Sequence, residues 1–294
     1  MQLQPSHLAD VAGLEVRRAL PRRAVRTVGA WCFADHFGPT PPGSDVALAV
    51  GPHPHTGLST VTWLLEGTER HTDSLGSDQW IRPGQLNLMT AGDGVAHAEQ
   101  GRPDGSTTHG VQLWVAQPEA TRHGPSAFEH HAELPEVDLG AARATVLVGE
   151  LHGAASPATV ATPLVGAQLA LRGGDVTIEV DPRFEHALLP LDGTIGVDGT
   201  AVDADVLADL APGTDHLRLS VGSGAGADRP VHVMLLGGEP FGEELLMWWN
   251  FVVRTRDEAV RASRDWNDGS ERFGEVESPL GRIPAPLPPW ADAP

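Results

Sequence analysis

The chain has 294 residues, and its 20 basic and 39 acidic side chains give a formal net charge of −19 at pH 7. Direct nucleic-acid binding is disfavoured, because a duplex-binding protein presents a basic face that this composition does not supply. The single cysteine, Cys32, excludes an internal disulfide framework and a thiolate-rich zinc site. The absence of tyrosine and lysine removes phenol acid–base chemistry and Schiff-base chemistry.

The N-terminus and the hydropathy pattern bear on location. Residues 1–12 lack the cationic start and apolar centre of a secretory signal. No run approaches eighteen uninterrupted apolar residues, the length that a membrane-spanning helix requires. These features predict a soluble, cytoplasmic protein that has no membrane partner.

Short apolar runs, separated by scattered glycines and prolines, recur along the whole chain. This pattern is typical of many short strands joined by turns, and it predicts an all-β sandwich or barrel. Polar or proline-rich stretches at residues 118–140 and from Ser278 onward are expected to interrupt the sheets. In chain order, the predicted strands are residues 60–65, 85–89, 111–115, 145–148, 165–171, 176–180, 186–190, 194–197 and 231–235.

One helix is predicted near the C-terminus, over residues 255–267. Thr255 can cap the first turn, and Glu258 three residues later completes a capping box. The helix should end before Asp268-Gly269. A short echo between residues 65–68 (LEGT) and 191–194 (LDGT) further suggests duplicated β domains.

Two pairs of polar residues stand out among the 14 histidines. His53-Pro54-His55 precedes the strand at residues 60–65, and His97-Ala98-Glu99 follows a turn-rich segment. A spacing of two places both side chains of a pair on one face of a strand, roughly 6.6 Å apart along it. Two such pairs on neighbouring strands can therefore converge on one point. Three imidazoles and a carboxylate suit iron, nickel, manganese, copper or zinc better than magnesium or calcium.

Residue parity favours an inward direction for the first pair. His53 and His55 share odd numbering with Val61, Trp63 and Leu65. If the strand continues without a bulge, the histidines and this apolar set line the same interior.

Several longer motifs extend this pattern over nearly the whole chain. Residues 51–76 begin GPHPHTG, and residues 81–100 end in TAGDGVAHAEQ. Upstream, residues 34–39 contain DHFGP; downstream, GEPF at 238–241 precedes WWNFVV at 248–253. Together, in this order, these motifs closely resemble the pirin family of the cupin superfamily.

The resemblance implies a bicupin, two tandem antiparallel β-barrels of the jelly-roll type with a short C-terminal helix. It implies an N-terminal metal-binding domain at residues 1–135 and a C-terminal domain without metal at residues 141–294, which includes the helix and the proline-rich tail. Carried over residue by residue, the family's ligands for one divalent ion fall on His53, His55, His97 and Glu99.

Some positions depart from the family pattern. Ser59 stands where an acidic residue is frequent, and Thr56 where an arginine is frequent. The C-terminal half has no H-x-H motif, and Phe184-Glu185-His186 lacks a partner pair, so no second metal is expected. Four further histidines match no family role and are expected to be structural or exposed: His71, His109, His130 and His131.

Pirins resemble flavonol dioxygenases in fold and metal site, which implies an oxidoreductase that cleaves a small aromatic substrate such as quercetin. In this hypothesis Glu99 is both a metal ligand and the base, and Fe²⁺ is the first candidate ion, ahead of nickel, manganese, copper and zinc. The alternative is a metal- or redox-responsive regulator that binds protein partners without significant turnover. A third hypothesis, a purely structural metal, is disfavoured because such sites are usually closed tetrahedral zinc sites.

Overall fold

The computed structural model describes residues 1–41, 43, 48–102, 106–222 and 229–291. Strands dominate, as the sequence predicts, and the chain forms two compact units. We call residues 10–15, 37–130 and 242–294 the first barrel, and residues 1–9, 16–36 and 131–241 the second barrel. The prediction of an all-β fold with two barrel domains is confirmed.

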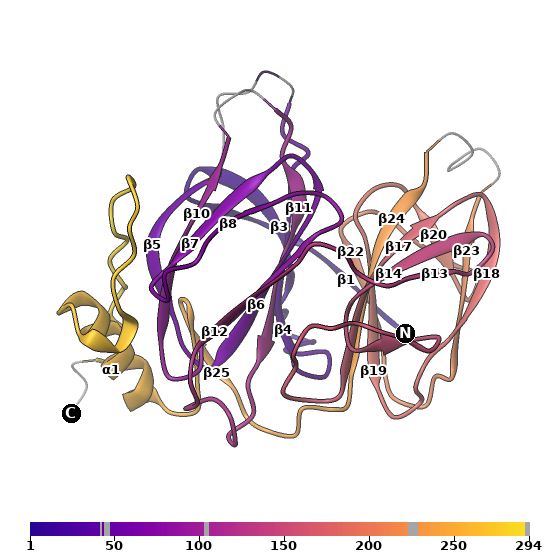
Figure 1. The fold of residues 1–294 in the computed structure, drawn as a ribbon. Helices are drawn as coiled ribbons and strands as arrows, with labels where there is room; N and C mark the ends of the chain where they lie inside the picture. The colour runs from indigo at the N-terminus through magenta and orange to yellow at the C-terminus, as the bar shows by residue number, and fades with distance from the viewer. Residues whose placement is uncertain (42, 44–47, 103–105, 223–228, 292–294) are drawn as a thin grey trace. The chain divides into compact units, whose positions relative to one another are not determined.

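The first barrel contains two arrays of strands, a four-stranded sheet and four strands of a seven-stranded sheet (Figure 1). In one the order is β5-β10-β7-β8, and in the other the neighbours are β12-β9-β6-β11. The strands are β5 (Ala49–His55), β6 (Leu58–Glu66), β7 (Glu69–Asp73), β8 (Asp78–Ile81), β9 (Leu86–Thr90), β10 (Val95–Gly101), β11 (His109–Ala116) and β12 (Ala127–His131).

Strand β6 forms the centre of the second array. Its β-branched and aromatic residues suit a pleated, buried surface. Val61 lies opposite Leu113 of β11 on one side and Leu88 of β9 on the other, and all three side chains are buried. Apolar contact across this array therefore holds the wall of the barrel in register.

The second barrel also contains two sheets, in the orders β1-β22-β19-β24-β17-β14-β13 and β18-β23-β20-β21. Between them lies a core of aliphatic side chains that includes Leu169, Leu188 and Leu235. The N-terminal strands of the chain are β1 (Gln2–Pro5), which belongs to the first of these sheets, and β2 (His7–Val11), β3 (Leu14–Leu20) and β4 (Trp31–Phe37), which belong to neither. The later ones are β13 (Glu136–Asp138), β14 (Ala142–Val148), β15 (Glu150–Leu151), β16 (Ala154–Ala155), β17 (Leu164–Leu171), β18 (Gly174–Glu179), β19 (Glu185–Pro190), β20 (Ile195–Val197), β21 (Thr200–Val202), β22 (Val206–Leu210), β23 (His216–Val221) and β24 (Val231–Gly238).

The N-terminal strands of the second barrel are fixed by contacts with residues far along the chain. The indole Nε1 of Trp31 donates to the carbonyl oxygens of Val165, at 3.1 Å, and Gly237, at 3.2 Å. The backbone N–H of Gly29 donates to the carboxylate of Glu185. These contacts explain why residues 16–36 group with residues 131–241.

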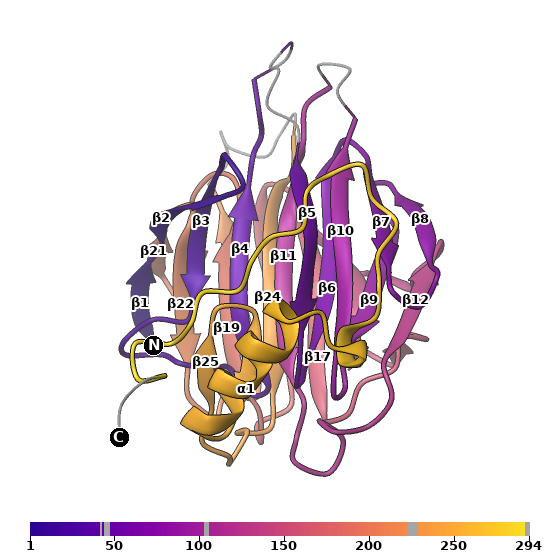
Figure 2. The same cartoon turned by 90° about the vertical axis from the view of Figure 1, so that its left-hand side faces the viewer.

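The C-terminal segment groups with the first barrel. It contains β25 (Leu246–Trp248), β26 (Phe251–Val253), α1 (Arg256–Asn267) and the 3₁₀ turn η1 (Glu271–Phe273). Phe251 bridges to Thr56, and the N–H of Ile283 donates to the carbonyl of Pro52 at 2.9 Å. Figure 2 shows the extended segment after η1 running alongside β5. Tertiary contacts thus group the C-terminal segment with the first barrel. The division into domains at residues 1–135 and 141–294 stays a prediction.

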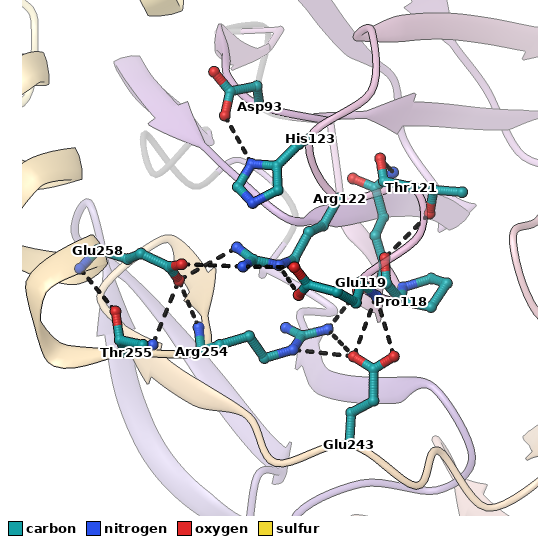
Figure 3. A network of polar contacts seen from close by, with 11 residues as sticks. Asp93, Pro118, Glu119, Thr121, Arg122, His123, Glu243, Arg254, Thr255 and Glu258 are labelled. Atoms are coloured by element: carbon teal, nitrogen blue, oxygen red, sulfur yellow. Dashed lines mark hydrogen bonds and ion pairs between the residues drawn. The ribbon is translucent and has the colours of Figure 1, made fainter.

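An ion-pair network joins α1 to the wall of the first barrel (Figure 3). The guanidinium of the buried Arg122 donates to Glu119 and, at 3.0 Å, to Glu258 of α1. The guanidinium of Arg254 donates to Glu243 and to the carbonyl of Gln117 at 2.8 Å. A partly desolvated network of this kind contributes more than isolated surface pairs, because its charges are less screened by water.

Most predicted elements form, and the differences have clear causes. The strand predictions between residues 60 and 235 are confirmed within a few residues. The prediction that residues 118–140 interrupt the sheets is wrong, because β12 and β13 form there. Both strands are polar and half-exposed. The sequence predicts no residue range for the other strands, which are β1–β5, β7, β8, β10, β12, β13, β15, β16, β21–β23, β25 and β26. The continuous strand behind the parity argument also does not form, because Thr56 and Gly57, the latter at φ +67°, separate β5 from β6.

Among the described residues, no helix combines the length and apolar character that a membrane span requires.

The predicted capping box is confirmed at the start of α1. The N–H of Glu258 donates to the hydroxyl of Thr255, and the Glu258 carboxylate accepts from the Thr255 N–H.

Replacing Thr255 by alanine should lower the free energy of unfolding by about 1 kcal/mol, because an N–H of the first turn loses its acceptor. Urea unfolding measures the change, with Thr255→Ser as the control that keeps the hydroxyl. Equal losses in both variants would contradict a role for the cap.

Candidate metal centre

Antiparallel pairing of β5 with β10 brings the two predicted pairs together. His53 lies directly opposite His97, and the register shifts between His97 and Glu99. β5 is the edge strand of its sheet, which explains how Pro54 is tolerated between the two histidines. One nitrogen from each ring of His53, His55 and His97 lies within 4.8 Å of the others, and all three residues are buried.

Backbone carbonyls fix the orientation of the first two rings. Nδ1 of His53 lies 2.8 Å from the carbonyl oxygen of Gly51, and Nδ1 of His55 lies 3.2 Å from that of Asn250. Because a carbonyl only accepts, each Nδ1 carries the proton and each Nε2 keeps its lone pair. Both rings are therefore held in the tautomer that binds a metal through Nε2.

Two side chains of β7 orient the third ring. Nδ1 of His97 lies 3.3 Å from Nδ1 of His71, and Nε2 of His71 lies 3.0 Å from the carboxylate of Asp73. With neutral rings, one arrangement satisfies both contacts: His71 donates from Nε2 to Asp73, and His97 donates from Nδ1 to His71. Nε2 of His97 is then unprotonated. His71 is also stacked on Phe128, with ring centroids 4.4 Å apart.

These contacts leave three Nε2 lone pairs converging on one buried point. Nε2 of His55 and Nε2 of His97 are only 3.0 Å apart. Burial lowers the pKa of His53 to about 4 and holds the pKa of His55 and His97 well below the usual value, so the rings are neutral at pH 7. Facing lone pairs repel unless a cation lies between them. The donor set therefore fits a divalent metal ion of the imidazole-binding class.

Glu99 lies on β10 beyond the register shift and is also buried. Its carboxylate accepts a hydrogen bond from Nε2 of Gln112 at 3.2 Å. Burial raises the pKa of Glu99 to about 7, and burial together with the Glu99 charge raises that of Glu69 on β7 well above its usual value. Among the described residues, the ligand atoms that lie within 4.8 Å of one another come from His53, His55 and His97. Glu99 does not belong to this group, so its role as a fourth ligand stays a prediction.

Of the four histidines with no expected role, one belongs to this site. His71 was expected to be structural or exposed, but it contacts His97 directly. His71 and Asp73 are two residues apart on one strand, the same spacing that identified His53/His55 and His97/Glu99. This spacing is the sequence signal that could have identified His71 and Asp73 as part of the site. His109 lies buried on β11. His130 and His131 lie on β12, and Nδ1 of His130 lies 2.8 Å from Oδ1 of Asn87.

Comparison with known proteins places these features in a family. The Pirin family model matches residues 13–115, and the model of the Pirin C-terminal cupin domain matches residues 167–274. A Caulobacter vibrioides protein named "Pirin-like protein" is 37% identical, over 91% of this chain and 93% of its own. The chain belongs to the pirin family.

Two further relatives of this pirin carry an enzyme name. A Pseudomonas aeruginosa protein named "Putative quercetin 2,3-dioxygenase" is 45% identical, over 99% of this chain and 91% of its own. A crystal structure titled as quercetin 2,3-dioxygenase from Acinetobacter baumannii is 42% identical, with a TM-score of 0.91, and covers 98% of this chain and 95% of its own. The resemblance read from the motifs is thereby confirmed.

Nitrogen-15 NMR of the histidine side chains in metal-free protein tests the orienting contacts. His53, His55 and His97 should each carry the proton on Nδ1, and His71 on Nε2. Asp73→Asn should change the tautomer populations of His71 and His97 and leave His53 unchanged, because His53 is held by a backbone carbonyl. An unchanged His97 in this variant would show that Asp73 does not orient it.

Proposed function

We propose that this pirin is a dioxygenase that depends on one divalent metal ion and cleaves flavonols such as quercetin. The observation that carries the proposal is the convergence of three neutral, oriented imidazoles in a buried site. The names of two relatives more than 40% identical supply the substrate class.

In this proposal Nε2 of His53, His55 and His97 and the carboxylate of Glu99 hold the ion. An ion bound there would supply Lewis acidity that stabilises the ionised hydroxyl of a substrate. Fe²⁺ is the first candidate, and nickel, manganese, copper and zinc accept the same ligand types. Hydrogen bonds to Gly51, Asn250 and His71 keep the rings in place, so binding requires little reorganisation.

Glu99 is suited to take the proton from the substrate hydroxyl. In the metal-free protein, burial raises the pKa of Glu99 to about 7, so its carboxylate is a stronger base than an exposed one once it is released from the ion. Gln112 donates to its Oε1 and so limits its rotation.

The proposal is tested by loading the purified protein with each candidate metal and following flavonol absorbance and oxygen consumption. Glu99→Gln should lower turnover by about 100-fold or more, because a carboxamide cannot accept the proton, while metal content falls less. Glu271→Gln, on the exposed turn η1, is the matched control.

Full activity of metal-loaded Glu99→Gln would show that Glu99 is not the base. Lack of turnover by the wild-type protein with every metal would contradict the dioxygenase proposal and favour a metal-responsive binding protein.

The pH dependence of metal affinity tests Glu99 as a ligand. The three histidines are already neutral above about pH 5, whereas Glu99 must lose a proton below about pH 7 before it can bind the ion. Affinity should therefore fall by about tenfold per pH unit as the pH drops from 7 to 5.5. In Glu99→Gln this slope should disappear, as competition with a chelator of known affinity would show. An unchanged slope would exclude Glu99 as the titrating ligand.

A further inference from the structure

The second barrel contains a cavity of about 440 Å³ that the metal centre does not involve. The apolar part of its lining includes Leu151, Leu164, Val165 and Phe184, and Leu151 and Val165 belong to the barrel core. This volume lies within the range of small-molecule pockets, which are typically apolar with a few polar groups that orient the ligand.

His186 of β19 is the buried polar group of this lining. It lies on the same face of the strand as Leu188 of the core, and its exposed fraction is 0%. Within the described residues, neither Nδ1 nor Nε2 has a hydrogen-bond partner. Burial lowers the pKa of His186 to about 4, so the ring is neutral at pH 7 and offers one donor and one acceptor. Burying such a group without partners is costly, which is a reason to expect that a ligand satisfies it.

Apart from His152, whose Nε2 accepts from the N–H of Glu179, the remaining polar lining is acidic. Glu150 and Glu179 are exposed, and Asp181 forms a bidentate pair with Arg183. No lysine or arginine occurs among the described residues that line the cavity. Its charge therefore disfavours anions and favours ligands with a positive end near the exposed carboxylates.

We propose that the second barrel binds a small aromatic amine with a hydroxyl group at its far end. The hydroxyl forms one hydrogen bond with the neutral imidazole of His186, either donating to the unprotonated ring nitrogen or accepting from the protonated one. The ring lies against the apolar lining beside Phe184, and the ammonium group lies near Glu150 and Glu179. This site is separate from the proposed flavonol site in chemistry as well as in sequence, because flavonols carry no ammonium group.

Tyramine is the probe for this arrangement. Its binding to the full-length protein is measured by titration calorimetry, with and without a chelator that removes metal from the first barrel. Binding should not depend on the chelator. Two analogues should each bind at least about tenfold more weakly than tyramine. Phenethylamine lacks the hydroxyl, and 3-(4-hydroxyphenyl)propionate has a carboxylate in place of the ammonium group.

Two variants test the named contacts. His186→Leu should weaken tyramine binding by about tenfold or more, and Glu150→Gln combined with Glu179→Gln should weaken it and reduce its dependence on salt. His232→Leu is the matched control, because His232 pairs with Asp192 and does not line the cavity. Its affinity for tyramine should equal that of the wild type.

Thermal unfolding distinguishes a binding role for His186 from a structural one. Removing an unsatisfied buried imidazole should raise the Tm of His186→Leu by about 2–4 °C in the absence of ligand, even as binding is lost. A lower Tm would show that His186 stabilises the fold and would overturn its assignment to the ligand.

The proposal is also overturned if tyramine does not bind at millimolar concentration, if His186→Leu binds it as well as the wild type, or if the carboxylate analogue binds as tightly.

Discussion

The pairing of β5 with β10 is the constraint on which the metal centre depends. It sets His53 directly opposite His97 at an edge of the sheet where Pro54 costs no backbone hydrogen bond. A slip of one residue in this register would turn one of the two spaced pairs away from the other. The apolar contacts of β6 with its neighbours hold the barrel wall in register, so ordinary core packing supports a polar site.

Orientation of the rings comes from a second layer of contacts. Gly51 acts from within β5, whereas Asn250 and the His71–Asp73 pair act from other parts of the chain. The network of Arg122 and Glu258 and the capping box of α1 hold the segment that supplies Asn250. The C-terminal helix thus acts on the metal centre through the backbone of the segment before it.

Buried polar groups are arranged differently at the metal centre and at the cavity of the second barrel. At the metal centre, the buried histidines and Glu99 face one another or have oriented partners, and their desolvation is offset when a cation joins the lone pairs. In the second barrel, His186 is buried at a cavity and has no partner within the described residues. Both arrangements reduce the stability of the unliganded protein, and such costs are typical of places where proteins bind ligands.

The sequence by itself determined the β class, nine of the strands, the capped helix and the two spaced pairs that meet at the metal centre. These features are local, because strand periodicity, capping and same-face spacing depend on residues within a few positions of one another. Only the tertiary structure decided that residues 242–294 group with the first barrel, that Asn250 and His71 orient ligands, and that His186 has no hydrogen-bond partner among the described residues. The first two features depend on contacts between residues far apart in the chain, and the third depends on which groups surround His186 in the folded protein. Local sequence patterns encode neither.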